Sequence, residues 1–213
     1  MAIDYSKTTG RGTVTLTKSV PTVSLTKATT RSGTLRVNLN WNPRPEGTGG
    51  LFRRAPAPID LDLGCLYEFT DGRKGVVQAL GDSFTASPKD IDGPVIRLDG
   101  DDRSGSNTEG ENLFIDLAHT DRIRRILIFA YIYEGAANWA AADGVATLYP
   151  VDGPPVVVLL DEAQQGARTC AIAMLESSEG GLVVSREVNY VHGFQSKLDK
   201  AYDWGLQWSP GSK

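Results

Sequence analysis

Carboxylate side chains gather in one short stretch of this sequence, LDGDDRSGSNTEGENL at residues 98–113. Five acids stand between Asp99 and Glu111, with Arg103 as the one basic residue and no apolar side chain among these thirteen positions. A hydrophobic core cannot stabilise such a segment, and repulsion between its like charges destabilises it. The stretch is therefore either a solvated acidic loop or a set of oxygen ligands for a hard cation, with Ca²⁺ as the best match.

A second pair of carboxylates lies on a predicted strand. Apolar side chains alternate with other residues over 59–69, which indicates a half-buried β-strand. Because alternate residues of a strand share a face, Asp60 and Asp62 should project together, about 7 Å apart. Gly100, Gly105 and Gly110 give the acidic loop backbone freedom. The aspartate pair on the strand and the acidic loop are therefore two candidate sources of oxygen ligands.

Other metals and other motifs fit less well. An EF-hand register that starts at Asp99 places Arg103 at position 5 and Gly110 at position 12, where a bidentate acid is required, so this loop type is excluded. Mg²⁺ demands stricter octahedral geometry and keeps its water. Zinc is disfavoured because the two histidines, His119 and His192, are not near a cysteine in the sequence.

Composition sets the broad class. The 213 residues carry a formal net charge of -4, and their apolar content is ordinary for a soluble fold. Cys65 and Cys170 are far apart and lie among apolar residues, which predicts buried free thiols in a reducing compartment and a cytoplasmic location. No signal-like or membrane-spanning run is present, so we expect no membrane insertion. No basic helix or aromatic platform is evident, so we expect no nucleic-acid binding.

The pattern of elements predicts an all-β fold. Residues 34–41 alternate strictly, residues 59–69 and 75–80 form a predicted hairpin, and residues 125–133 have the β-branched and aromatic content of a central strand. Further strands are expected near 145–149, 156–160, 170–175 and 182–191. With the two short N-terminal strands described below, the total of nine or ten strands predicts a β-sandwich of two mostly antiparallel sheets.

Three further elements are expected outside this set. The repeats VTLTK (14–18) and VSLTK (23–27) predict two short strands joined by a turn, with an extended tail as the alternative. Residues 136–142 predict a short helix. Near the C-terminus, the spacing of Phe194, Leu198, Ala201 and Tyr202 predicts an amphipathic helix that packs on the sandwich.

Taken together, these motifs resemble the TerD family of tellurium-resistance and stress-response proteins. The resemblance rests, in order, on Asn38–Arg44, Ile59–Leu63, Gly100–Gly105 with Glu109–Asn112, and Phe129–Glu134. It implies a TerD-like calcium-binding domain over residues 13–208, preceded by an N-terminal extension (1–12) and followed by a C-terminal tail (209–213). It also implies one or two Ca²⁺ ions, a bacterial stress-response role and stress-response partners at the membrane. The implied ligands are Asp60, Asp62, Asp101, Asp102, Glu109, Glu111 and Asn112.

Catalysis is not expected. The sequence has no G-x-S-x-G elbow, P-loop or H-E-x-x-H motif, and clustered acids suit an ion better than an acid and base with separated pKa values. The alternative function is a calcium-stabilised carbohydrate-binding module with Trp139 as a sugar platform. A purely solvated acidic loop with no ion is the third possibility.

Overall fold

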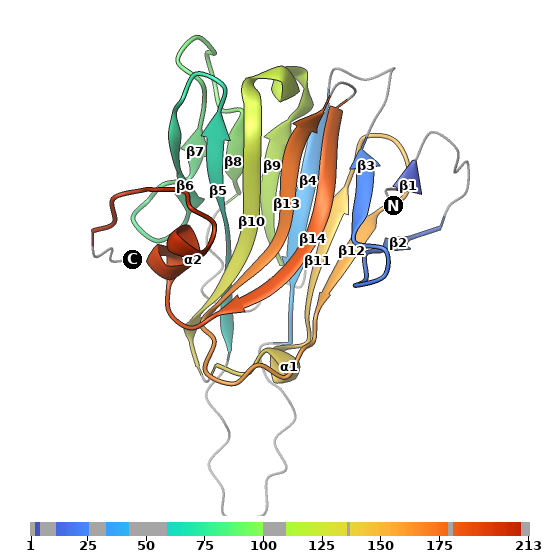
Figure 1. The fold of residues 1–213 in the computed structure, drawn as a ribbon, viewed down its shortest axis with the longest axis vertical. Coiled ribbons are helices and arrows are strands. Elements are labelled where there is room, and N and C mark those ends of the chain that lie inside the picture. The colour runs from blue at the N-terminus through green and yellow to red at the C-terminus, as the bar shows by residue number, and fades with distance from the viewer. Residues whose placement is uncertain are drawn as a thin grey trace, which may run out of the picture.

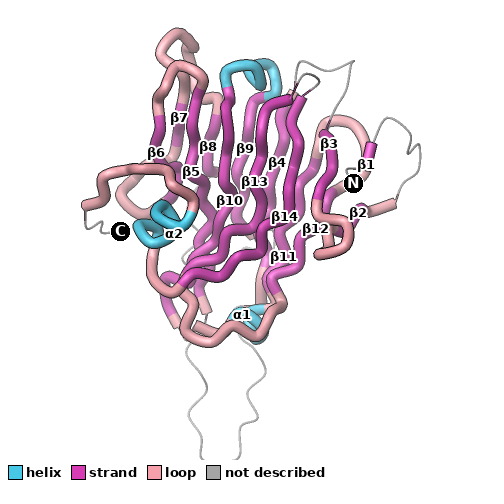
Figure 2. Tube along the Cα trace, viewed as in Figure 1, coloured by secondary structure: helices cyan, strands magenta, loops and turns pink. Residues whose placement is uncertain are grey.

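Two β-sheets packed face to face form the body of the chain (Figure 1 and Figure 2). This computed structural model describes residues 3–4, 12–25, 33–42, 59–99, 110–135, 137–178 and 181–209. Each sheet has seven strands, and almost all neighbouring strands are antiparallel. The predicted all-β sandwich is confirmed.

Sheet A consists, in spatial order, of β1 (Ile3–Asp4), β3 (Thr22–Leu25), β14 (Gly181–Val191), β13 (Thr169–Ser178), β10 (Ile123–Glu134), β5 (Asp60–Phe69) and β6 (Lys74–Gln78). Sheet B consists of β2 (Val14–Thr15), β12 (Val156–Leu160), β11 (Gly144–Tyr149), β4 (Thr34–Asn40), β9 (Glu111–Asp116), β8 (Ile96–Leu98) and β7 (Thr85–Ala86). The expected nine or ten strands were too few, because β1 and β7 have two residues each, β8 has three, and such short strands show no alternation.

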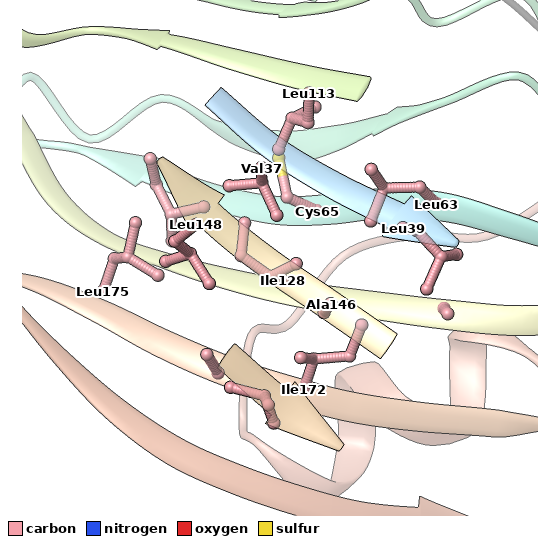
Figure 3. Packing of buried hydrophobic residues seen from close by; sticks show 14 of the residues in the cluster. Val37, Leu39, Leu63, Cys65, Leu113, Ile128, Ala146, Leu148, Ile172 and Leu175 are labelled. Carbon is pink, nitrogen blue, oxygen red and sulfur yellow. The ribbon is translucent and has the colours of Figure 1, made fainter. Parts of the chain in front are cut away.

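The hydrophobic core lies between the inner faces of the two sheets. Val37 and Leu39 of β4 face Leu63 and Cys65 of β5 across the sandwich, as Figure 3 shows. The alternation predicted for these strands is therefore correct, since every second residue enters the core. Cys65 and Cys170 are both free and buried, as predicted, and burial raises the pKa of each thiol above its usual value.

The two N-terminal repeats are strands joined by a turn, but they do not pair with each other. β2 pairs in parallel with β12 in sheet B, whereas β3 pairs with β14 in sheet A. Reciprocal hydrogen bonds between Thr17 and Val20 close the turn that links them. Residues 12–25, which we call the N-terminal strap, therefore connect the two sheets at one side of the sandwich.

The C-terminal segment, residues 195–208, covers the outer face of sheet A (Figure 1). It begins with α2 (Gln195–Ala201), and Leu198 and Trp204 are buried against Leu66 and Phe129 of the sheet. The predicted helix is confirmed, but its predicted apolar face is only partly correct. Phe194 lies at the N-terminal cap and is 50% exposed, and Ala201 is exposed.

Two other short helices lie at opposite ends of the sandwich (Figure 2). They are η2 (Leu117–Arg122), which links β9 to β10, and α1 (Trp139–Ala142). Asn138 caps α1, so the helix begins at Trp139 and is shorter than the predicted 136–142. Asp143 adopts a left-handed backbone conformation and ends the helix where predicted. In the described part of the chain, no helix has both the length and the apolar character needed to cross a bilayer.

A charged cluster joins the C-terminal segment to sheet A. Glu68, 4% exposed, accepts hydrogen bonds from Arg124 Nη1 at 2.9 Å and Arg125 Nε at 2.8 Å. Lys74 Nζ lies 3.7 Å from the same carboxylate. Burial alone would raise the pKa of Glu68, but the bond from Arg125 and the three nearby positive charges outweigh burial and lower this pKa below its usual value.

We expect Glu68→Gln to lower the free energy of unfolding at pH 7 by about 2 kcal/mol. Because the pKa of Glu68 is lower in the folded chain, its stabilisation is present above about pH 4.3 and is lost as the pH falls through the folded-state pKa. Urea denaturation of wild type and variant between pH 7 and pH 3 measures both effects, and the two curves should converge at the acid end. Asp90→Asn, which breaks an exposed pair with Arg122, is the control and should change little. A constant gap between the wild type and Glu68→Gln at all pH values would contradict this account.

Candidate functional site

The candidate ligands that the structure describes, Asp60, Asp62, Glu111 and Asn112, lie at one end of the sandwich, at the lower end of Figure 1, where β5 and β9 begin. At this end Trp41 Nε1 donates to the carbonyl oxygen of Ile59 at 3.0 Å, and Asn42 N donates to Ala142 O at 2.7 Å. These bonds fix the end of β4 against β5 and α1. The start of β5 is therefore held firmly in place.

Asp60 and Asp62 share the outer face of sheet A. Leu61 and Leu63 enter the core between the sheets, so alternation places the two aspartates on the opposite face of β5, as predicted. Asp62 is 0% exposed and Asp60 is partly exposed. Across the sheet, Asp62 lies opposite Tyr131 of β10.

Glu111 reaches β5 from the other sheet. It is the first residue of β9 and shares the inward-facing phase of Leu113 and Ile115, and it is 2% exposed. Its Oε2 accepts a hydrogen bond from the backbone nitrogen of Leu63 at 2.6 Å. Glu111 therefore places a buried carboxylate against β5, the strand that carries Asp60 and Asp62. The contact is at Leu63, just outside the part of β5 that pairs with β6.

Gly110 determines where Glu111 lies. Its φ is +69°, and a Cβ atom at this position would lie 2.1 Å from the carbonyl oxygen of Leu39. The acidic segment thus re-enters the fold in direct contact with the backbone of β4. Only glycine satisfies both conditions, since other residues disfavour this φ and have no space for a side chain.

Asn112 points away from Glu111, because successive strand residues face opposite sides. Its Oδ1 accepts hydrogen bonds from Asn38 Nδ2 at 3.0 Å and Arg36 Nη1 at 3.2 Å. Its Nδ2 donates to Asp99 Oδ2 at 2.8 Å, and its backbone nitrogen donates to Asp99 Oδ1 at 3.0 Å. Asn112 therefore joins the two ends of the acidic segment on the outer face of sheet B.

Of the seven predicted ligands, Asp101, Asp102 and Glu109 lie outside the described residues. Within the described ranges, no three His, Cys, Asp or Glu side chains come together to hold a metal ion. The structure brings Glu111 to the strand of Asp60 and Asp62, and it places Asn112 on the other face of β9. The remaining donors, all oxygens, suit a hard cation such as Ca²⁺.

The interactions of Glu111 and Asp99 were missed in the sequence. For Glu111 the sequence did contain a signal. An acid at an inward-facing strand position must meet a polar partner, so a buried hydrogen bond could have been predicted. The bonding of Asp99 with Asn112 has no such signal. Trp139, the predicted sugar platform, is 0% exposed, and its Nε1 donates to Ala167 O at 2.8 Å.

The chain is similar to proteins of known name and known structure. It is 41% identical over 203 residues to the tellurium resistance protein TerA of an Alcaligenes species, a match over 94% of this chain and 58% of the relative. The chain thus spans well under two thirds of the length of that relative. No protein-family model matches it.

Two solved structures share the fold. A homologue of the telluride resistance protein TerD from Streptomyces coelicolor A3(2) aligns with a TM-score of 0.54 and 18% identity, covering 78% of this chain and 94% of the other. A protein of unknown function aligns with a TM-score of 0.52 and 15% identity over the same shares of the chains. The fold is thus the β-sandwich of TerD homologues. The similarity to a tellurium resistance protein and to the fold of a TerD homologue supports the resemblance to the TerD family that the motifs indicated.

Proposed function

We propose that this chain is a non-enzymatic calcium-binding protein of the tellurium-resistance type, acting in bacterial stress response. The observation that carries the proposal is the hydrogen bond from Leu63 N to Glu111 Oε2 at 2.6 Å. It fixes a buried carboxylate of one sheet against the strand of the other sheet that carries the aspartate pair. This arrangement supports a cation site that joins the two sheets.

In this proposal Asp60, Asp62 and Glu111 hold one or two Ca²⁺ ions together with Asp101, Asp102 and Glu109, the acids that the family resemblance assigns. Six to eight oxygens at about 2.3–2.6 Å are typical of calcium. Asn112 has a different role from the one first expected. Since its Oδ1 already accepts two hydrogen bonds, we assign it to holding the base of the acidic segment.

The role in tellurium resistance rests on the similarity to TerA, which is named for it and is longer than this chain. Stress-response proteins at the membrane are the proposed partners. The alternative function, a carbohydrate-binding module, loses its support because Trp139 is buried and cannot offer a ring to a sugar.

Calcium titration tests the site directly. We expect isothermal titration calorimetry to show binding to the wild type, and Asp62→Asn and Glu111→Gln to weaken it at least about tenfold, a loss of about 1.4 kcal/mol. Calcium should also raise the midpoint of thermal unfolding, because a ligand at about 100 times its Kd stabilises the folded state by about 2.7 kcal/mol.

Asp92→Asn is the matched control, since this exposed carboxylate lies in the connection between β7 and β8, and it should bind as the wild type does. Absence of calcium heat in the wild type, together with a melting temperature unchanged by a chelator, would refute the proposal. Equal weakening by all three variants would refute the ligand assignment.

A further inference from the structure

Alternating arginine and aromatic side chains form a row across the outer face of sheet B. The strand register places Tyr149 of β11 beside Arg36 of β4, Arg36 beside Phe114 of β9, and Phe114 beside Arg97 of β8. The Arg36 guanidinium lies 4.1 Å from the centroid of Tyr149, and that of Arg97 lies 4.4 Å from the centroid of Phe114. We call these four residues the arginine–aromatic row.

None of the three helices in the described chain covers this row. α2 packs on the opposite sheet, and α1 and η2 lie at the ends of the sandwich (Figure 1 and Figure 2). Arg97 is exposed, and the other three side chains of the row are half-buried. Arginine and tyrosine are enriched at the centres of protein interfaces, because they combine a large contact area with directional polar groups.

The order of the row makes it complementary to its own reverse. A two-fold axis that lies parallel to the strands, between β4 and β9, brings a second copy of sheet B face to face with the first and reverses the row. Arg36 then meets Phe114 of the partner subunit, and Tyr149 meets Arg97 of the partner subunit. We propose that this face is the interface of a symmetric homodimer, in which every cation of one row packs on an aromatic ring of the other.

One neighbouring row agrees with the same axis. Thr34 pairs with Asp116 in the register of β4 and β9, so reversal places the Thr34 hydroxyl against Asp116 of the partner subunit. Asn38 and Asn112, the pair on the other side of the row, are 8% and 7% exposed and bond to each other, so they take no part in the interface. An axis perpendicular to the strands would instead place arginine against arginine. Only the parallel axis gives complementary contacts.

The size of the face predicts a weak dimer. The five strands from β12 to β8 span about 20 Å at their usual spacing, and seven residues of strand extend about 24 Å. Each copy thus contributes about 500 Å², and the total of about 1,000 Å² is at the low end for specific interfaces. We therefore expect an equilibrium that depends on concentration.

Sedimentation velocity at protein concentrations from about 1 μM to about 500 μM tests the dimer. Each concentration is measured once with calcium and once with a chelator, so that the result does not depend on the proposed cation site. We expect the wild type to pass from monomer to dimer over this range. Two double variants should each remain monomeric. Arg36→Glu with Arg97→Glu places acids against rings, and Phe114→Arg with Tyr149→Arg places cations against cations.

The two double variants should associate when mixed, because each glutamate of one then faces an introduced arginine of the other. This recovery distinguishes a lost interface from a misfolded variant, and circular dichroism checks the fold of each. The proposal is overturned if the wild type stays monomeric at every concentration, if either double variant dimerises as the wild type does, or if the mixture shows no association.

Discussion

We expect Trp204→Ala to lower the free energy of unfolding by about 3–5 kcal/mol and the midpoint of thermal unfolding by about 10 °C. Trp204 is 0% exposed, and its Nε1 donates to Tyr67 O at 3.0 Å. The Arg125 guanidinium lies 3.8 Å from the centroid of its ring. The substitution removes all three contributions and leaves a cavity beneath the C-terminal segment. Urea and thermal denaturation measure the loss.

Trp208→Ala is the matched control for this prediction. Trp208 belongs to the same segment, but it is half-exposed, and its main polar contact is the bond from its Nε1 to Asp199 Oδ2 at 2.8 Å. Its loss should cost about 1–2 kcal/mol. If Trp204→Ala were no more destabilising than Trp208→Ala, the segment would not be anchored through Trp204.

Gly110→Ala should lower the free energy of unfolding by at least about 2 kcal/mol and weaken calcium binding at least about tenfold. The added Cβ would lie 2.1 Å from Leu39 O, and the φ of +69° disfavours alanine. The backbone must then move away from β4, which separates Glu111 from Leu63. Chemical denaturation measures the stability, and calorimetry measures the affinity.

Gly72→Ala separates the effect of backbone strain from the effect of a collision with β4. Gly72 has a φ of +84°, but no atom lies within 4 Å of the position that a Cβ atom would take, so this variant adds backbone strain without a collision. We expect a loss of about 1 kcal/mol and no change in calcium affinity. Equal effects of the two substitutions on stability and affinity would show that contact with β4 does not position Glu111.

Local alternation was enough to predict the strands that face the core. In β4 and β5 the positions of Leu39 and Leu63 follow from period two alone, because one face of each strand is buried. The same rule places Glu111 and Asn112 on opposite faces of β9. The sequence alone therefore already argued against assigning both residues as ligands of one ion.

The strand that each N-terminal repeat pairs with could not be predicted from the local sequence. The repeats at 14–18 and 23–27 are nearly identical, yet β2 joins sheet B and β3 joins sheet A, because each is selected by the strand edge that it meets. Burial of Trp139 also depends on distant residues, since Ala167 and Tyr190 surround its ring. Such contacts follow from tertiary packing, which short-range patterns do not encode.

The N-terminal strap has a consequence for the order of folding. Its two strands are made before most of the sandwich, but their partners, β12 and β14, lie in the last third of the residues given. During synthesis the strap therefore exists before the strands that it pairs with. The positive charge of Lys18, which follows β2, disfavours pairing of the strap with other chains in this period. Closure of the sandwich along this side is therefore a late event, and the assembly rate should be governed by long-range contacts.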